Sequence, residues 1–151
     1  MMNYNLSKIL LELTTLPEYK NQLYLQGNRS DMDPIEPTRG QNYLYVDDNE
    51  LEYNINLFDI PYINSIINEH GLVRTRIMRM KPKTCLYWHN DYTKRLHIPV
   101  VTNPHCFLIV DGEQMHLPAT GEAYVIDTTK MHTALNASKQ DRIHIVGAFS
   151  V

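Results

Sequence analysis

The chain has 151 residues, a length typical of one domain. Hydrophobic residues make up 43% and charged residues 21%, as in ordinary globular proteins, and the net charge of -3 gives no electrostatic basis for binding nucleic acid or an anionic membrane. No apolar run approaches the roughly 18 residues that span a bilayer, and the N-terminus lacks a secretory signal pattern. The only cysteines, Cys85 and Cys106, are too few for a disulfide framework, so we expect a cytoplasmic protein.

The first 71 residues are expected to be helical and irregular. Leucine and isoleucine at three- and four-residue spacing predict an amphipathic helix within residues 1–20 that stops at Pro17, and alternation predicts a short strand at 22–26. Residues 28–42 are rich in loop formers, and they either connect two elements at the surface or form a lid over a site. Residues 43–58 mix short apolar and acidic pieces and show no clear pattern.

The hydrophobic period changes from helical to alternating after Gly71. Residues 61–70 predict a helix, because proline suits its first turn and Gly71 can end it in the left-handed conformation. Eight short extended segments follow, and Asp111-Gly112 is a hairpin signal between two of them. We therefore expect a mainly β domain over residues 1–151, a double-stranded β-helix (jelly roll, cupin-like) over 72–151 with the N-terminal helices packed outside. The eight predicted strands are 72–80, 85–89, 94–102, 105–111, 113–117, 122–127, 131–137 and 142–150.

The last of these strands carries an arginine in an apolar setting. Both faces of 142–150 are largely apolar, so we expect it to be central in its sheet and covered on both sides. A guanidinium buried there is costly unless it is paired. The partner of Arg142 is either internal, namely Asp127, Asp141 or a backbone carbonyl, or it is the carboxylate of a bound small molecule held in a fork.

A candidate metal site combines the H-x-D pair of His89 and Asp91 with the distant His132. Side chains at i and i+2 of an extended segment point to the same side, so the pair can converge on one point. Two histidines and one carboxylate, with open positions, are typical of non-haem Fe(II) oxygenases. Three protein ligands and a water also suit catalytic zinc. An isolated H-x-D pair is more often an ordinary turn.

A second cationic group comes from Arg95 and His97, which lie on one face of a predicted strand. Two cationic groups flanking a metal would suit a bridging dicarboxylate, whereas the simpler interpretation is an exposed edge strand with a surface salt bridge. The aromatic residues near the H-x-D pair could line a cavity, but the simpler interpretation is that they pack in the core: Tyr87, Trp88 and Tyr92.

About half of the chain, from Arg76 to Ala148, resembles the aspartyl/asparaginyl β-hydroxylase family of Fe(II)- and 2-oxoglutarate-dependent oxygenases, in particular the branch with free-proline hydroxylases. No motif that we can name covers the first 70 residues. The resemblance rests on the order and spacing of Pro82, His89-x-Asp91, Arg95-x-His97-x-Pro99, Thr102-Asn103, Val110-Asp111-Gly112-Glu113, Gly121-Glu122, Asp127, His132, Asn136 and Asp141-Arg142-x-His144.

The resemblance implies a hydroxylase that couples oxidative decarboxylation of 2-oxoglutarate by O2, which gives succinate and CO2, to hydroxylation of an amino acid or peptidyl residue. Some members place a serine beside the distal carboxylate of 2-oxoglutarate at the position of Met78, which cannot donate a hydrogen bond. The implied roles are Fe(II) ligation by His89, Asp91 and His132, binding of the distal 2-oxoglutarate carboxylate by Arg142, and contact with its metal-proximal end by Arg95 and His97.

Arg76 shares a strand face with Met78, and we expect it to face the cavity. It either binds a substrate carboxylate, assists 2-oxoglutarate binding, or forms an internal salt bridge. Two other functions remain compatible with the sequence: a cupin-like zinc hydrolase or isomerase with the same ligands, and a non-catalytic module that binds a small carboxylate. The sequence predicts a small-molecule or peptide substrate and gives no oligomeric state.

Overall fold

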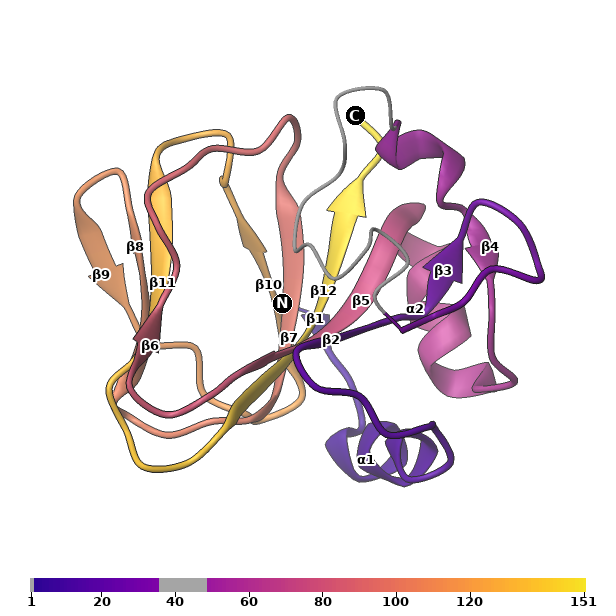
Figure 1. The fold of residues 1–151 in the computed structure, drawn as a ribbon, viewed down its shortest axis with the longest axis horizontal. Helices are drawn as coiled ribbons and strands as arrows, with labels where there is room; N and C mark the ends of the chain where they lie inside the picture. The colour runs from indigo at the N-terminus through magenta and orange to yellow at the C-terminus, as the bar shows by residue number, and fades with distance from the viewer. Residues whose placement is uncertain (1, 36–48) are drawn as a thin grey trace.

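The structure, a computed structural model, describes residues 2–35 and 49–151. Within these ranges the chain forms two α-helices, one 3-10 helix and a set of mostly short strands. Figure 1 shows how these elements are arranged. In chain order the elements are β1 (Met2–Asn3), α1 (Leu6–Leu13), β2 (Gln22–Tyr24), β3 (Gln26–Gly27), the 3-10 helix η1 (Glu50–Glu52), β4 (Ile55–Asn56), α2 (Pro61–His70), β5 (Leu72–Met80), β6 (Thr84–Cys85), β7 (Arg95–Val101), β8 (Cys106–Val110), β9 (Glu113–Met115), β10 (Glu122–Ile126), β11 (His132–Asn136) and β12 (Arg142–Phe149).

The strands of the core form two antiparallel sheets that lie opposite each other (Figure 1). The larger sheet has the order β1-β10-β7-β12-β5-β2, and the smaller one has the order β6-β11-β8-β9. A third, two-stranded sheet pairs β3 with β4. This arrangement is the predicted mainly β, jelly-roll fold.

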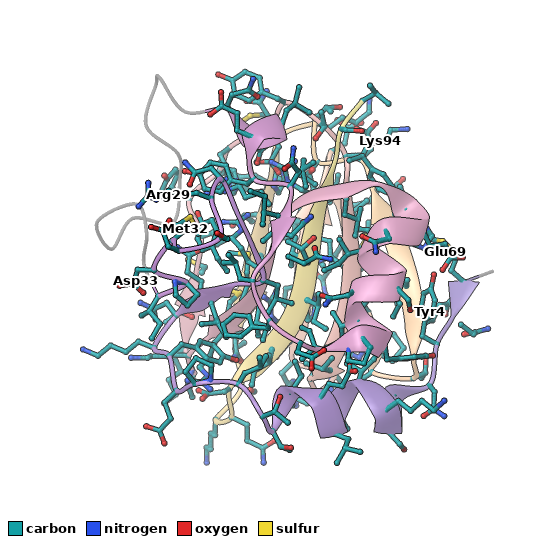
Figure 2. All side chains as sticks on the ribbon, turned by 90° about the vertical axis from the view of Figure 1, so that its right-hand side faces the viewer. Tyr4, Arg29, Met32, Asp33, Glu69 and Lys94 are labelled. Atoms are coloured by element: carbon teal, nitrogen blue, oxygen red, sulfur yellow. The ribbon has the colours of Figure 1, made fainter. Side chains whose placement is uncertain are left out.

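Both helices cover the outer face of the larger sheet, which confirms that they pack outside the roll. Ile63, Ile66 and Ile67 of α2 are buried in the same apolar cluster as Ile77 and Ile145 of the sheet. Figure 2 shows α2 from the side, with Tyr4 beside Glu69 near its C-terminal end, where the Tyr4 hydroxyl donates to Glu69 Oε2 at 3.0 Å. Neither described helix is long and apolar enough to cross a membrane.

Strand β12 is central in the larger sheet, as its sequence predicts, because it pairs with β5 on one side and β7 on the other. Ile143 and Ile145 face the helices and belong to or pack against their apolar cluster. Arg142 and Val146 face the opposite way, into the space between the two sheets. The alternation of one strand therefore separates an apolar outer core from a cationic interior.

Several boundaries differ from those predicted. The first helix ends at Leu13 because the hydroxyls of Thr14 and Thr15 donate to carbonyls of the last turn, at 2.6 and 2.7 Å. The predicted strand 85–89 is wrong over most of its length, since pairing beyond β6 is limited to isolated contacts. Residues 36–42 of the proposed lid at 28–42, and residues 43–48 of the segment 43–58, lie outside the described residues.

The N-terminus of α2 is capped from another helix. Ile60, its N-cap residue, offers no side-chain oxygen. The Glu12 carboxylate accepts instead from the backbone N–H of Tyr62 and of Ile63, both at 2.8 Å. A carboxylate at this position satisfies two unpaired donors and complements the helix dipole, so it fixes α1 against α2.

We expect Glu12→Gln to lower the free energy of unfolding by about 1 kcal/mol, because glutamine keeps one acceptor oxygen and loses the charge. Urea denaturation at neutral pH measures this difference. Glu18→Gln is the matched control, since Glu18 is exposed beyond the helix and should leave stability unchanged. Equal effects of the two variants would contradict the capping role.

Candidate metal centre and cofactor pocket

A pocket lies between the two sheets and opens near the end of β6 and the start of β11. Strands β5, β7 and β12 supply a wall with four arginines, and β8 and β11 supply the facing, more apolar wall. Every residue that the sequence assigned to the site lines this pocket: His89, Asp91, His132, Arg142, Arg95, His97 and Arg76.

The backbone brings the three candidate metal ligands together. His89 and His132 form an isolated antiparallel bridge, in which each backbone N–H donates to the carbonyl of the other residue, at 3.1 and 2.9 Å. Asp91 is fixed in the same way, because its N–H donates to the Thr128 carbonyl at 2.8 Å. One potential ligand atom from each of the three residues lies within 4.8 Å of the others, so the predicted convergence is present.

The two imidazoles are oriented for a cation. Nδ1 of His89 is 2.9 Å from the Tyr87 carbonyl oxygen, and Nδ1 of His132 is 2.8 Å from the Lys130 carbonyl oxygen. A carbonyl can only accept, so Nδ1 carries the proton in both rings and each neutral Nε2 keeps its lone pair. Burial lowers the pKa of His132, which favours that neutral form. With the Asp91 carboxylate, this donor set fits a divalent metal ion.

Arg142 forms no ion pair with any acid among the residues that the structure describes. Its side chain is buried, its Nε has no hydrogen-bond partner, and no carboxylate of the described residues lies within ion-pair distance of it. The two expected internal partners are engaged elsewhere: Asp127 accepts from Thr129, and Asp141 lies 3.6 Å from Arg79. Burial lowers the pKa of Arg142 to about 10, so it remains a cation at neutral pH.

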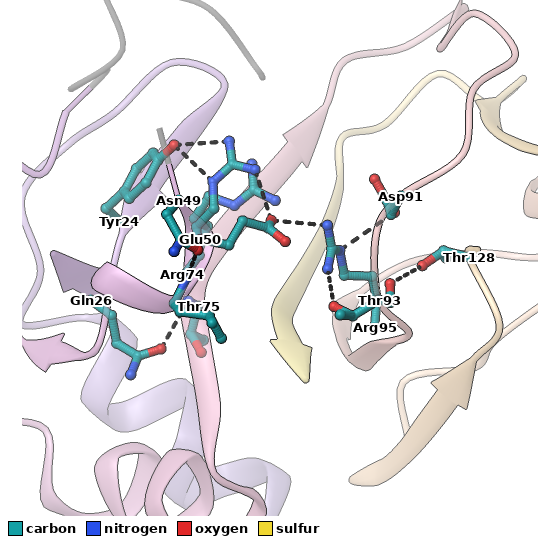
Figure 3. A network of polar contacts seen from close by, with 12 residues as sticks. Tyr24, Gln26, Asn49, Glu50, Arg74, Thr75, Asp91, Thr93, Arg95 and Thr128 are labelled. Carbon is teal, nitrogen blue, oxygen red and sulfur yellow. Dashed lines mark hydrogen bonds and ion pairs between the residues drawn. The ribbon is translucent and has the colours of Figure 1, made fainter. Parts of the chain in front are cut away.

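Arg95 is buried in the same wall but is already paired. Its guanidinium contacts Glu50 Oε1 at 2.9 Å, Thr93 Oγ1 at 2.9 Å and Asp91 Oδ2 at 3.4 Å (Figure 3). Because β7 lies between β10 and β12, the alternative of an exposed edge strand with a surface salt bridge is wrong. The sequence analysis missed Glu50, which lies in an acidic stretch that resembles a solvated loop.

Two neutral histidines lie deeper in the wall. Nδ1 of His97 and Nδ1 of His144 are 3.1 Å apart, so one ring donates to the other. Burial, followed by the positive charges of Arg142 and Arg95, lowers the pKa of His97 to about 3. The pKa of His144 is lowered in the same direction, again mainly by burial. Both rings are therefore neutral at neutral pH, and the positive charge of the wall comes from the arginines.

Arg76 faces the pocket from β5, beside Met78, as predicted. Its Nη1 donates to Gln22 Oε1 at 3.2 Å, and its guanidinium stacks over Tyr24. Burial and the charge of Arg74 lower the pKa of Arg76 to about 9.

The expectation that the aromatic residues near the H-x-D pair pack in the core is wrong, because 71% of Tyr87, 52% of Trp88 and 95% of Tyr92 is exposed. The alternative, that they line a cavity, holds for Tyr87, which borders the pocket, and not for Trp88 or Tyr92.

The fold and this donor set define a double-stranded β-helix protein with a candidate centre of two histidines and one carboxylate. The sequence model of the family described as aspartyl/asparaginyl β-hydroxylase matches residues 4–150. The chain therefore belongs to the aspartyl/asparaginyl β-hydroxylase family. No curated protein matches the sequence.

Solved structures with a similar fold are distant. The plu4264 protein from Photorhabdus luminescens is 14% identical, with a TM-score of 0.43. The match covers 50% of this chain and 61% of the plu4264 chain, so over a third of that protein has no counterpart in the match. A cupin domain from Bordetella pertussis is 17% identical, with a TM-score of 0.43. The match covers 52% of this chain and 81% of that domain. A predicted oxalate decarboxylase from Thermotoga maritima is 11% identical, with a TM-score of 0.46. The match covers 58% of this chain and 74% of that protein.

The buried histidines predict a pH dependence of stability. The unfolded chain protonates His97 near its ordinary pKa of 6.5, whereas the folded protein does so only near 3. Between these values the unfolded state binds more protons, so the free energy of unfolding falls as pH falls, by up to about 1.4 kcal/mol per pH unit. Above pH 6.5 the residue contributes no pH dependence.

Urea denaturation of metal-free protein between pH 7 and 5 measures this slope. We expect His97→Gln to reduce the slope by about one proton, since it removes one of the groups that titrates only after unfolding. An unchanged slope in the variant would show that His97 is protonated in the folded state.

Proposed function

We propose that the protein is a hydroxylase that depends on Fe(II) and 2-oxoglutarate and acts on an amino acid or a residue within a peptide. In the overall reaction, substrate C–H, O2 and 2-oxoglutarate give substrate C–OH, succinate and CO2. When bound, Fe(II) would supply the activation of O2, and 2-oxoglutarate would supply two electrons through its decarboxylation. His89, Asp91 and His132 would hold the metal on one face and leave positions open for other ligands.

The observation that carries this proposal is a buried cation in the same pocket as the metal-ligand cluster, with no carboxylate of residues 2–35 or 49–151 within ion-pair distance of it. A guanidinium such as that of Arg142 is costly in a sheet unless an anion pairs with it. A ligand with a carboxylate at each end can meet both needs, since one end reaches the metal and the other forms a fork with Arg142. 2-Oxoglutarate has this chemistry, and it accounts for an arginine on a central strand.

The other cationic residues of the wall have supporting roles in this proposal. His97 is neutral and borders the pocket, so it can hydrogen-bond a bound carboxylate without adding charge. Arg95 would lie beside the metal-proximal end of 2-oxoglutarate while keeping its ion pairs. Met78 offers no hydrogen bond to the distal carboxylate, which leaves that task to Arg142.

Arg76 is the residue to which we assign a carboxylate of the substrate. It is buried, and it faces the pocket from the same wall as Arg142. A guanidinium in this position can hold a carboxylate in a fork.

Arg142→Met should abolish 2-oxoglutarate binding while leaving the metal-free protein at least as stable as the wild type, because it replaces a buried, unneutralised charge with an apolar chain. Calorimetry with Mn(II)-loaded protein under anaerobic conditions measures the binding, and thermal unfolding measures the stability. Arg79→Met is the control, since Arg79 lies on the same strand as Arg76 but outside the pocket. Wild-type affinity in Arg142→Met would remove this residue from the cofactor site.

Succinate formation tests the function itself. Purified protein with Fe(II), O2 and 2-oxoglutarate should release succinate slowly alone and faster with its substrate, and a screen of free amino acids and short peptides should find a product 16 Da heavier, the mass of one oxygen atom. Anaerobic Fe(II) and 2-oxoglutarate should also give a weak visible charge-transfer band. Zinc retention without 2-oxoglutarate binding would identify a zinc enzyme instead, and binding without any succinate would identify a non-catalytic module.

A further inference from the structure

The carboxylate of Glu50 lies between two buried guanidinium groups. A single oxygen, Oε1, accepts from Arg74 Nη1 at 3.1 Å and from Arg95 Nη2 at 2.9 Å (Figure 3). The exposed fractions of the three side chains are 11% for Glu50 and 6% for each arginine. Charges so far from water interact strongly, so Glu50 stabilises both arginines in their charged form.

The side of this cluster away from the metal site is fixed by several further contacts. Asn49 caps η1 by accepting from the Leu51 N–H at 3.0 Å, and the Arg74 N–H donates to the Tyr53 carbonyl at 2.7 Å. Arg74 adopts a φ of +48°, a strained conformation for a residue other than glycine. Its guanidinium also donates twice to the Tyr24 hydroxyl, at 3.1 and 3.2 Å. Glu50 is therefore held in place independently of Arg95.

The other side of the cluster reaches the candidate metal centre. Arg95 Nε lies 3.4 Å from Asp91 Oδ2, and that same oxygen is 3.5 Å from His132 Nε2. Arg95 thus divides its charge between Glu50 and Asp91. The shorter contact, at 2.9 Å, is the one to Glu50.

We propose that Glu50 is a positioning residue for the metal centre: by holding Arg95, it keeps the Asp91 carboxylate available to a metal ion. This inference rests on the metal site of the proposed function. Without Glu50, Asp91 is the one carboxylate of the described residues still within ion-pair range of Arg95. Arg95 would then compete with the metal for Asp91. Loss of a group that orients a metal ligand typically weakens metal binding roughly 10- to 100-fold.

The test compares Glu50→Gln with Glu52→Gln, which makes the same charge change at an exposed position of the same 3-10 helix. Calorimetric titration with Mn(II), without 2-oxoglutarate, gives the metal affinity. We expect about tenfold or greater weakening in Glu50→Gln and wild-type affinity in Glu52→Gln. Wild-type affinity in a folded Glu50→Gln protein, or equal weakening in both variants, would overturn the proposal.

Glu50→Gln leaves two buried cations with less compensating charge, which by itself could disturb the protein. A second pair of variants, Arg95→Gln and the double variant Arg95→Gln/Glu50→Gln, separates this effect from the proposed one. In an Arg95→Gln background the competing cation is absent, so adding Glu50→Gln should change the Mn(II) affinity no further. A further loss in the double variant would mean that Glu50 does not act through Arg95, and would overturn the proposal. These titrations need no turnover, so a protein that binds Mn(II) in this pattern but forms no succinate would refute the proposed function alone.

Discussion

A reciprocal pair of backbone hydrogen bonds between His89 and His132 is the constraint on which the site depends. The two residues are far apart in the sequence, and this bridge is an isolated contact beyond the regular pairing of β6 and β11. It sets the two rings at a centroid separation of 4.3 Å. In each ring the Nδ1–H donates to a backbone carbonyl, and this hydrogen bond orients the ring. The positions of both Nε2 atoms are therefore determined mainly by the main chain.

The larger sheet supplies the complementary half of the site. Its central strands place four arginines on the inner face, while isoleucines on the outer face pack under the helices. Glu50 neutralises part of this charge, but Arg142 has no carboxylate partner among the residues described. An unpaired buried charge lowers stability, so a fold under selection for stability alone would not retain it. The cost is understandable if an anionic ligand completes the pocket.

The features that sequence could predict are those with a strong local pattern. Alternation predicted β5 and the central position of β12, and the Pro61 and Gly71 signals predicted α2, in which Gly71 adopts a φ of +59°. The H-x-D spacing predicted the side on which His89 and Asp91 meet, because that geometry is fixed by two residues of extended chain.

The features that sequence could not predict depend on tertiary context. Glu50 follows acidic residues in a segment without periodicity, and only the fold shows that it lies between arginines of two different strands. One signal in the sequence could have indicated a distant acid. The predicted strand faces carry more arginines than neighbouring acids, so a buried arginine needs a partner from elsewhere in the chain. The aromatic residues around His89 were misjudged because hydrophobicity alone does not distinguish a core residue from an exposed loop residue at the mouth of a site.

The central claim is that His89, Asp91 and His132 share one metal ion in the pocket that contains Arg142. The most direct measurement is anomalous diffraction from crystals grown with Mn(II) and 2-oxoglutarate without oxygen. The account predicts one strong anomalous peak about 2 Å from a ligand atom of each of the three residues, with a carboxylate of 2-oxoglutarate paired with Arg142. A peak that excludes any of the three, or 2-oxoglutarate bound without contact to Arg142, would contradict it.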